Sequence, residues 1–182
     1  NAASIENLAR EVKDNGGVYI VPAFSGLFAP YWRPDARGVI VGLTRFANRK
    51  HLARAVLEST AYQTRDVADA MVADSGVEIT ELRVDGGMTM NELLMQFQSD
   101  ILGVEVHRPK NIETTATGAA FAAGLDHGFW DDLSVLGSQT GDMKVFKPKR
   151  DKEEVEGLYR DWKRAIKRSL EWEDNEDEDL NI

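Results

Sequence analysis

The sequence has no cysteine among its 182 residues. Disulfides and thiolate metal sites are therefore excluded, and the absence agrees with a cytoplasmic location, where thiols stay reduced. No run of about 18 or more apolar residues occurs, so we expect no integral membrane segment. The chain also lacks GxxxxGK[ST] and GxGxxG sequences, which excludes a P-loop and a Rossmann fingerprint.

No extended stripe of Lys or Arg occurs, and the basic cluster at residues 163–168 is small. The formal net charge is −9, and residues 171–179 hold seven acids and no base, so the rest of the chain is close to neutral. Nucleic-acid binding needs clustered cations, and we therefore expect no nucleic-acid partner. We expect residues 174–182 to be a disordered acidic tail.

The histidines lack the spacing of a metal site such as HExxH, and we expect structural or surface roles and no metal ligand. They are His51, His107 and His127. Charged residues on the long helix expected at 48–73 are interpreted as an exposed polar network without a catalytic role. They are Glu58, Arg65 and Asp66.

Apolar periodicity predicts alternating strands and helices, which is typical of an α/β domain built on a sheet. Strands are expected at 18–21, 38–43, 81–84 and 104–108, and helices at 4–13, 48–73, 115–125 and 152–172. Asn48 is expected to cap the long helix. One domain with a C-terminal helix accounts for this order.

The stretch "LRVDGGMTMNELLMQFQSDILG" places Gly86 and Gly87 between an apolar strand and an amphipathic helix. Thr89 and Glu92 have the spacing of a capping box, which predicts that the helix begins close to Gly87. Two bare residues at such a junction let a flat ring or a phosphate approach the backbone. Asn91 offers a donor and an acceptor to a heteroaromatic edge. The alternative is a tight turn without a ligand.

A second segment, "ETTATGAAFAAGLDHG", places Gly118 and Gly124 inside a predicted helix. Glycine inside a helix costs roughly 1 kcal/mol relative to alanine, so the pair predicts a close approach by another element. That element is either a helix outside this chain or part of the same domain. In the "PYWRP" loop, Tyr31 and Trp32 likewise pack either on a neighbour or on their own domain.

Four blocks together resemble the C-terminal domain of the FGGY carbohydrate kinases, glycerol kinases in particular, from about Ser4 to Glu173. The blocks are "APYWRPDARGVIVGLTR", "LESTAYQTRDV", "RVDGGMTMN" and "TTATGAAFAAG". The resemblance implies an actin-like, ribonuclease H-like ATPase fold with a mixed sheet flanked by helices. Two such domains close on ATP, and residues 1–173 would be the C-terminal nucleotide-binding domain.

The resemblance also implies roles for residues. Asp85-Gly86-Gly87 would be the adenosine motif, in which Gly86 makes the bend while Gly87 and Asn91 contact the adenosine part of ATP. The helix at 114–125 would be the second connecting helix at the interdomain hinge. Asp85 is expected to fix the glycine turn through local hydrogen bonds and not to act as a base.

In this family the general base, the polyol pocket and the phosphate loops lie upstream. We therefore expect no catalytic residue here, ATP and magnesium held mainly by an upstream domain, and no activity of the fragment alone. The chain does not begin with Met, and Asn1-Ala2 is interpreted as a cleavage scar.

The resemblance implies an enzyme that transfers the ATP γ-phosphate to glycerol, giving sn-glycerol 3-phosphate, and that works as a homodimer or homotetramer in the cytoplasm. Two alternatives remain at this stage. One is a pentulose or other sugar kinase of the same family. The other is a non-catalytic module, either an actin-like ATPase or a free-standing interaction domain.

Overall fold

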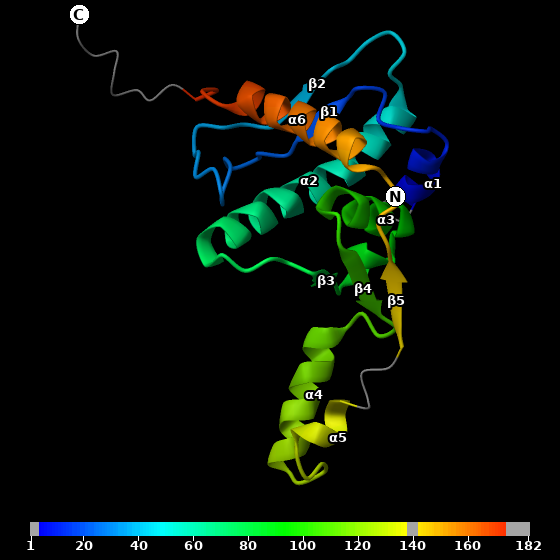
Figure 1. Ribbon diagram of the computed structural model, residues 1–182, viewed down its shortest axis with the longest axis vertical. Helices are drawn as coiled ribbons and strands as arrows, with labels where there is room; N and C mark the ends of the chain where they lie inside the picture. The colour runs from blue at the N-terminus through cyan, green and yellow to red at the C-terminus, as the bar shows by residue number, and fades with distance from the viewer. Residues whose placement is uncertain (1–3, 138–141, 174–182) are drawn as a thin grey trace, which may run out of the picture. The chain divides into compact units, whose positions relative to one another are not determined.

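The computed structural model describes residues 4–137 and 142–173 (Figure 1). The expected acidic tail at 174–182 and the Asn1-Ala2 pair lie outside these residues. Contacts divide the chain into two compact units, residues 1–78 with 149–182 and residues 79–148. In the described ranges, no helix combines the length and apolar character needed to cross a membrane.

The first unit combines three helices with a two-stranded sheet. The helices are α1 (Ile5–Arg10), α2 (Arg49–Ser75) and α6 (Lys152–Ser169), and the strands are β1 (Tyr19–Val21) and β2 (Val39–Val41). The strands pair antiparallel with Ile20 opposite Ile40. Helix α2 packs on α1 and β1, and α6 packs on both strands, as Figure 1 shows.

Helix α2 keeps close to its predicted limits because its ends carry the expected signals. The Asn48 side chain accepts a hydrogen bond from the Lys50 N–H, and His51 completes a capping box, so this histidine is structural. Gly76 ends the helix in a left-handed conformation at φ 69°. Inside the unit, the Tyr62 ring stacks on Trp162 with 5.2 Å between centroids.

The interpretation of the charges on α2 as an exposed network is wrong for two of the three residues. Glu58 and Asp66 are only 3% and 2% exposed. Glu58 pairs with the buried Arg54 at 2.6 Å, and its burial raises the pKa of its carboxyl. Arg65 contacts Glu156 at 2.6 Å. Periodicity did not reveal the burial of Asp66 because its partners lie on α6, far along the chain, whereas Arg54, the partner of Glu58, lies four residues earlier on α2.

Asp66 joins α2 to α6. Its carboxylate accepts hydrogen bonds from the Tyr159 hydroxyl at 2.5 Å and the Trp162 indole N–H at 2.8 Å, and Lys163 Nζ lies 2.8 Å away. Burial, followed by the neighbouring Asp66 carboxylate, raises the pKa of Tyr159. A buried charge with this many partners specifies how the two helices pack.

The two aromatics of the "PYWRP" loop behave differently. The Tyr31 hydroxyl accepts a hydrogen bond from Lys163 Nζ at 2.9 Å, so Tyr31 packs on its own unit. Trp32 is 70% exposed. Packing against a neighbouring domain or subunit therefore remains an alternative for Trp32 but not for Tyr31.

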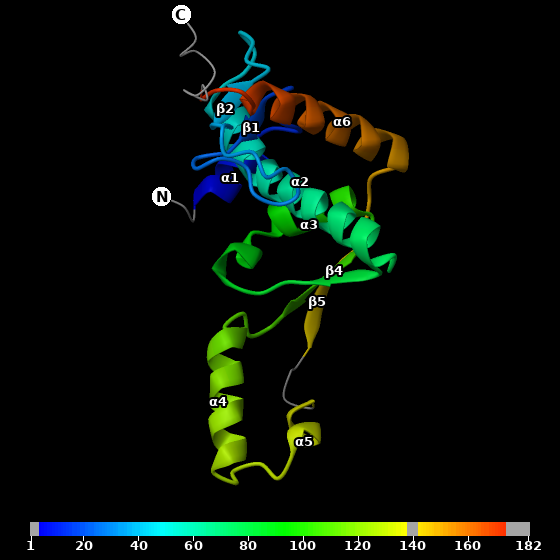
Figure 2. The same cartoon turned by 90° about the vertical axis from the view of Figure 1, so that its left-hand side faces the viewer.

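The second unit is a three-stranded mixed sheet with helices. Its strands are β3 (Glu81–Arg83), β4 (Glu105–Pro109) and β5 (Met143–Phe146), and its helices are η2 (Gly87–Met90), α3 (Glu92–Leu102), α4 (Thr114–Asp126) and α5 (Leu133–Gly137). In the order β3-β4-β5, β3 is parallel and β5 antiparallel to β4. Helix α3 packs on β4 and β5. Figure 2 shows α4 following the end of β4, with α5 beside it.

The faces of β4 follow the two-residue alternation of a strand. Val106 and Arg108 are buried, whereas Glu105 and His107 are half-buried on the other side. There, a hydrogen bond from Lys147 lowers the pKa of the Glu105 carboxyl. This ion pair is exposed and adds little to stability.

The helix after the glycines does not begin where the capping-box spacing predicts. Gly87–Met90 form the short 3-10 helix η2, and α3 begins at Glu92, with Asn91 Oδ1 accepting from the Leu94 N–H at 2.9 Å. The Thr89 hydroxyl instead donates to the Gly86 carbonyl at 2.7 Å. The predicted cap at Thr89 is therefore wrong, because that side chain closes η2.

Replacing Asp66 with alanine should destabilise the chain by at least about 2 kcal/mol, because the Tyr159 hydroxyl and the Trp162 indole N–H would both lose their buried acceptor and an unpaired buried donor costs about 1–3 kcal/mol. Chemical denaturation monitored by tryptophan fluorescence measures this change. Asp161→Ala is the control, since Asp161 makes an exposed ion pair with Arg164, and it should cost less than about 1 kcal/mol. Equal effects of the two substitutions would contradict the assigned role of Asp66.

Candidate functional site

Gly86 redirects the chain between β3 and η2. Its backbone angles are φ 83° and ψ 167°, a conformation that is essentially restricted to glycine. Its N–H donates to the Ile112 carbonyl at 2.9 Å. The bend expected at Gly86 is therefore present, and the backbone alone requires glycine there.

Gly87 is different, because the protein's own packing gives no reason for a glycine. Its φ lies outside the left-handed range, and among the described residues no heavy atom beyond its chain neighbours lies within 4 Å of where a Cβ would stand. The residue is exposed at the start of η2. The bare backbone at Gly87 thus opens onto space that an external group can enter.

Asn91 lies at the far end of the same turn and is half-buried. Its Oδ1 accepts the Leu94 N–H, so the acceptor that the sequence offered to a ligand is already used as a helix cap. No other described residue forms a hydrogen bond with its Nδ2. The amide N–H₂ group is therefore the part of Asn91 that is available to a ligand.

Asp85 was expected to fix the glycine turn through local hydrogen bonds, and this expectation is wrong. Its carboxylate accepts a short hydrogen bond from the Thr114 hydroxyl, at the first residue of α4. With the bond from Gly86 to Ile112, this contact ties the end of β3 to the start of α4. The expectation of a local bond missed this because Thr114 is 29 residues away.

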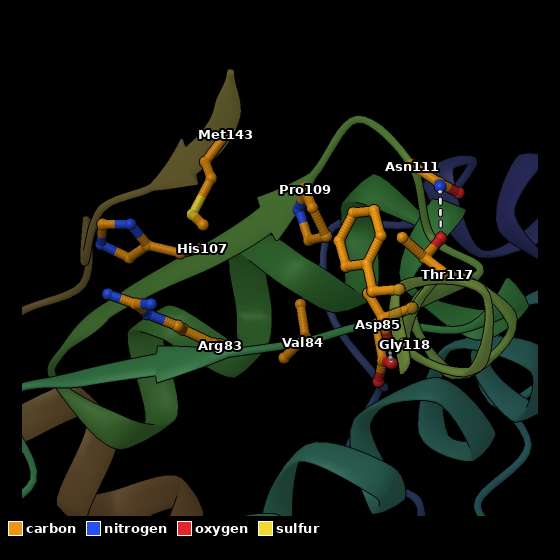
Figure 3. Close-up of a pocket in the computed structure, with 11 residues that line it drawn as sticks. Arg83, Val84, Asp85, His107, Pro109, Asn111, Thr117, Gly118 and Met143 are labelled. Atoms are coloured by element: carbon orange, nitrogen blue, oxygen red, sulfur yellow. Dashed lines mark hydrogen bonds between the residues drawn. The ribbon is translucent and has the colours of Figure 1, made fainter. Parts of the chain in front are cut away.

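A hollow of about 410 Å³ lies beside this junction. Figure 3 shows Arg83 and His107 at one end and Asp85 and Gly118 at the other, with Pro109 and Val84 between them. The lining is Arg83, Val84, Asp85, His107, Pro109, Asn111, Thr114, Thr117, Gly118, Phe121 and Met143. None of the residues predicted to contact a ligand, Gly86, Gly87 and Asn91, belongs to it. The hollow is therefore a neighbour of the predicted site, and the two share Asp85 at their boundary.

The two glycines of α4 have separate explanations. A Cβ at Gly124 would collide with the Trp130 ring, so this glycine permits packing inside the unit. At Gly118, no heavy atom of the described residues, apart from near neighbours in the helix, lies within 4 Å of where a Cβ would stand. Helix α4 also contains no buried residue. The close neighbour at Gly124 is therefore the Trp130 side chain from the segment after α4, and not the backbone of another element as predicted, while Gly118 lines the hollow.

Arg108 is a residue at the site that the sequence reasoning missed. It is 8% exposed, and its Nη1 donates to the carbonyl of Thr89 in η2 at 2.6 Å. A signal existed in the alternation of β4, since Arg108 follows the apolar Val106 by two residues and therefore shares its inward face.

The described residues contain no group of three or more His, Asp or Glu side chains arranged to hold a metal ion. His107 Nε2 lies 3.1 Å from Glu105 and 3.6 Å from Glu81. The histidine is thus paired with carboxylates on the sheet face.

The chain is similar to curated glycerol kinases over nearly its whole length. It is 68% identical over 98% of its residues to glycerol kinase of Corynebacterium kroppenstedtii, and 64% identical over 97% to that of Pseudarthrobacter chlorophenolicus. It spans about a third of the length of these relatives, 35% in each case.

Solved structures of carbohydrate kinases are also similar to the chain over nearly its whole length. The crystal structure of Plasmodium falciparum glycerol kinase with ADP matches at a TM-score of 0.83 and 38% identity, over 93% of this chain and 34% of that one. Xylulose kinase of Rhodospirillum rubrum matches at 0.72 and 29% identity, over 92% of this chain and 34% of that one. The predicted fold class, α/β of the actin-like ATPase type, is confirmed.

The model of the FGGY family of carbohydrate kinases, C-terminal domain, matches residues 2–126. These residues include α2, the glycine turn, α3 and α4. The chain belongs to the FGGY family of carbohydrate kinases.

Proposed function

We propose that this chain is the C-terminal, ATP-binding part of a glycerol kinase, which transfers the γ-phosphate of ATP to glycerol and yields sn-glycerol 3-phosphate. The curated relatives at 60–68% identity are named glycerol kinase, and the similar solved glycerol kinase is described with ADP. The observation that carries the nucleotide part of the proposal is the bare, accessible backbone of Gly87.

The turn supplies the contacts that adenosine needs. Gly86 turns the chain, Gly87 leaves room for a flat ring against the main chain, and the Asn91 amide can donate to a ring nitrogen. A Cβ at position 87 would occupy that space without meeting any of the described residues beyond its chain neighbours within 4 Å. Glycine at 87 is therefore explained by a ligand better than by packing.

Phosphoryl transfer requires a metal ion, phosphate-binding backbone and a base in line with the γ-phosphate. We place these groups, with the glycerol pocket, on the part of the protein that the relatives have and this chain does not. Magnesium would be held mainly there, with the nucleotide's phosphates. Within this chain Asp85 is committed to Thr114, which supports a structural role and not that of a base.

A pentulose kinase is the second candidate, because solved xylulose kinases share the fold at TM-scores of 0.72 and 0.73. The first candidate has more support, since the 68% and 64% identity to curated glycerol kinases is more than twice the 24% and 29% to the two xylulose kinases. The relatives described above are named as kinases, which favours a catalytic protein over a non-catalytic actin-like module.

We place the intact enzyme in the cytoplasm as a homodimer or homotetramer. Large exposed aromatics support an interface on the first unit, because aromatic side chains are enriched in protein contacts. They are Phe24, Phe28 and Trp32, which are 83%, 70% and 70% exposed.

Titration of the chain with ADP should shift the backbone amide signals of Gly86 and Gly87 and the side-chain amide signals of Asn91. Gly87→Val should abolish these shifts, because the added side chain fills the space next to the main chain. Asn91→Asp keeps the cap acceptor but removes the N–H₂ donor, and it should weaken binding without loss of stability. Unchanged signals at millimolar ADP would exclude this turn as the adenosine site.

A stability control separates binding from folding. Gly86→Ala should cost about 1–3 kcal/mol, because alanine is strained in the conformation of Gly86. Gly87→Ala should change stability by less than about 0.5 kcal/mol, as expected for an exposed site without strain. If Gly87→Ala were the more destabilising of the two, its glycine would serve the fold and the argument for a ligand would fail.

The substrate is tested on the intact protein by measuring ADP release with glycerol, xylulose and ribulose. Turnover should be fast with glycerol, slow or absent with the pentuloses, and dependent on magnesium. This chain alone should release no ADP with any of them, because it lacks the groups that position the γ-phosphate. Fast turnover with a pentulose and none with glycerol would establish the second candidate instead.

A further inference from the structure

The turn that carries Gly87 and Asn91 stands largely in solvent. Gly87 is exposed, and Met88 and Met90 are 62% and 56% exposed. Inside the turn, the Thr89 N–H and hydroxyl both donate to the Gly86 carbonyl, at 3.1 and 2.7 Å. These local bonds close the turn but do not determine where it lies on the sheet.

Arg108 connects the turn to the sheet. The residue lies on β4 beside Val106, on the buried face, and its Nη1 donates to the Thr89 carbonyl at 2.6 Å. Thr89 and Arg108 are 6% and 8% exposed, so this bond is made away from solvent. A hydrogen bond from a charged donor is stronger than a neutral one, and a buried carbonyl that loses its donor is left with an unfavourable unpaired acceptor.

The same guanidinium meets two further elements. Its Nη2 lies 3.6 Å from Glu92 Oε1 at the start of α3, and its Cζ lies 5.6 Å from the centre of the Phe146 ring on β5. Groups from η2, α3 and β5 therefore converge on one planar side chain. Because guanidinium is rigid and offers several fixed donors, it can hold these elements in one relative arrangement better than lysine can.

We propose that Arg108 is a positioning residue for nucleotide binding, which holds the η2 turn so that Gly87 and the Asn91 amide meet the adenosine moiety at the correct distance. This inference rests on the proposed function of the turn. In this role Arg108 does not touch the nucleotide and acts through the Thr89 carbonyl. Its loss should therefore affect ATP binding and base selection more than the chemical step or the binding of glycerol.

The test uses the intact kinase with Arg108→Met, Arg108→Lys and the control Lys147→Met. Lys147 is a matched cation near the same sheet, but its side chain is 72% exposed and pairs only with Glu105 among the described residues. For each variant we would measure kcat, the KM for ATP, the KM for glycerol and the ratio of kcat/KM for ATP over GTP.

Arg108→Met should raise the KM for ATP about tenfold and reduce the preference for ATP over GTP, while kcat and the KM for glycerol change by less than about twofold. Arg108→Lys keeps a single donor and should raise the KM for ATP about threefold. Lys147→Met should match the unmodified enzyme in all four quantities.

A purely structural role would lower stability and kcat without a selective effect on ATP, and that result would overturn the proposal. If Arg108→Met does not fold, Arg108→Lys decides, and a wild-type KM for ATP and base preference in that variant would overturn it. Gly87→Val measured in parallel separates the two ideas. If it leaves the KM for ATP unchanged, the proposed site is wrong; if it raises that KM while the Arg108 variants do not, only the positioning role is wrong.

Discussion

The chain can pass from β3 into η2 only because residue 86 has no side chain. At φ 83° and ψ 167° the backbone of Gly86 occupies a region that other residues reach only under strain. This single bend directs Gly87 outward and places Thr89 inward against the sheet. The accessible backbone, the buried carbonyl and the helix cap at Asn91 all depend on it.

The two adjacent glycines differ in whether the fold itself requires the side chain to be absent. Gly86 is required by backbone geometry, whereas Gly87 is required by nothing in the described structure. The same division applies to α4, where Gly124 admits the Trp130 ring and Gly118 faces the hollow. A glycine without a reason among the described residues is a candidate for contact with a group outside the chain, and the proposal for Gly87 rests on this.

Two buried charges organise the two units in a similar way. Asp66 receives hydrogen bonds from Tyr159 and Trp162 on α6, and Arg108 donates to Thr89 while lying near Glu92. A buried charge is tolerated only when its partners are in place, so each charge specifies one arrangement of the elements around it. In the first unit this fixes the packing of helices, and in the second it fixes the turn.

The local pattern of the sequence determined much of this protein. Residues near one another in the chain specify helix ends, strand alternation and turns, and so the limits of α2 and α4 were predicted from the pattern of residues. The bend at Gly86 and the family were implied by the resemblance to the FGGY kinases. The α5 helix and the 3-10 helix before α3 were not predicted, because both are short. For the 3-10 helix, the spacing of Thr89 and Glu92 also suggested a cap at Thr89 instead.

Only the tertiary structure decided which polar groups are buried and what they meet. Asp66 and Glu58 looked like surface charge, Asp85 was expected to bond locally, and the Asn91 acceptor was assigned to a ligand. For Asp85 and Asp66 the interpretation changed because the partner comes from another element, as Thr114 does for Asp85 and Tyr159 does for Asp66. For Glu58 and Asn91 the partners, Arg54 and Leu94, are close in the chain, and the structure decided between pairing with them and an exposed or ligand-binding role. Pairing between distant residues depends on their positions in space, which periodicity does not encode.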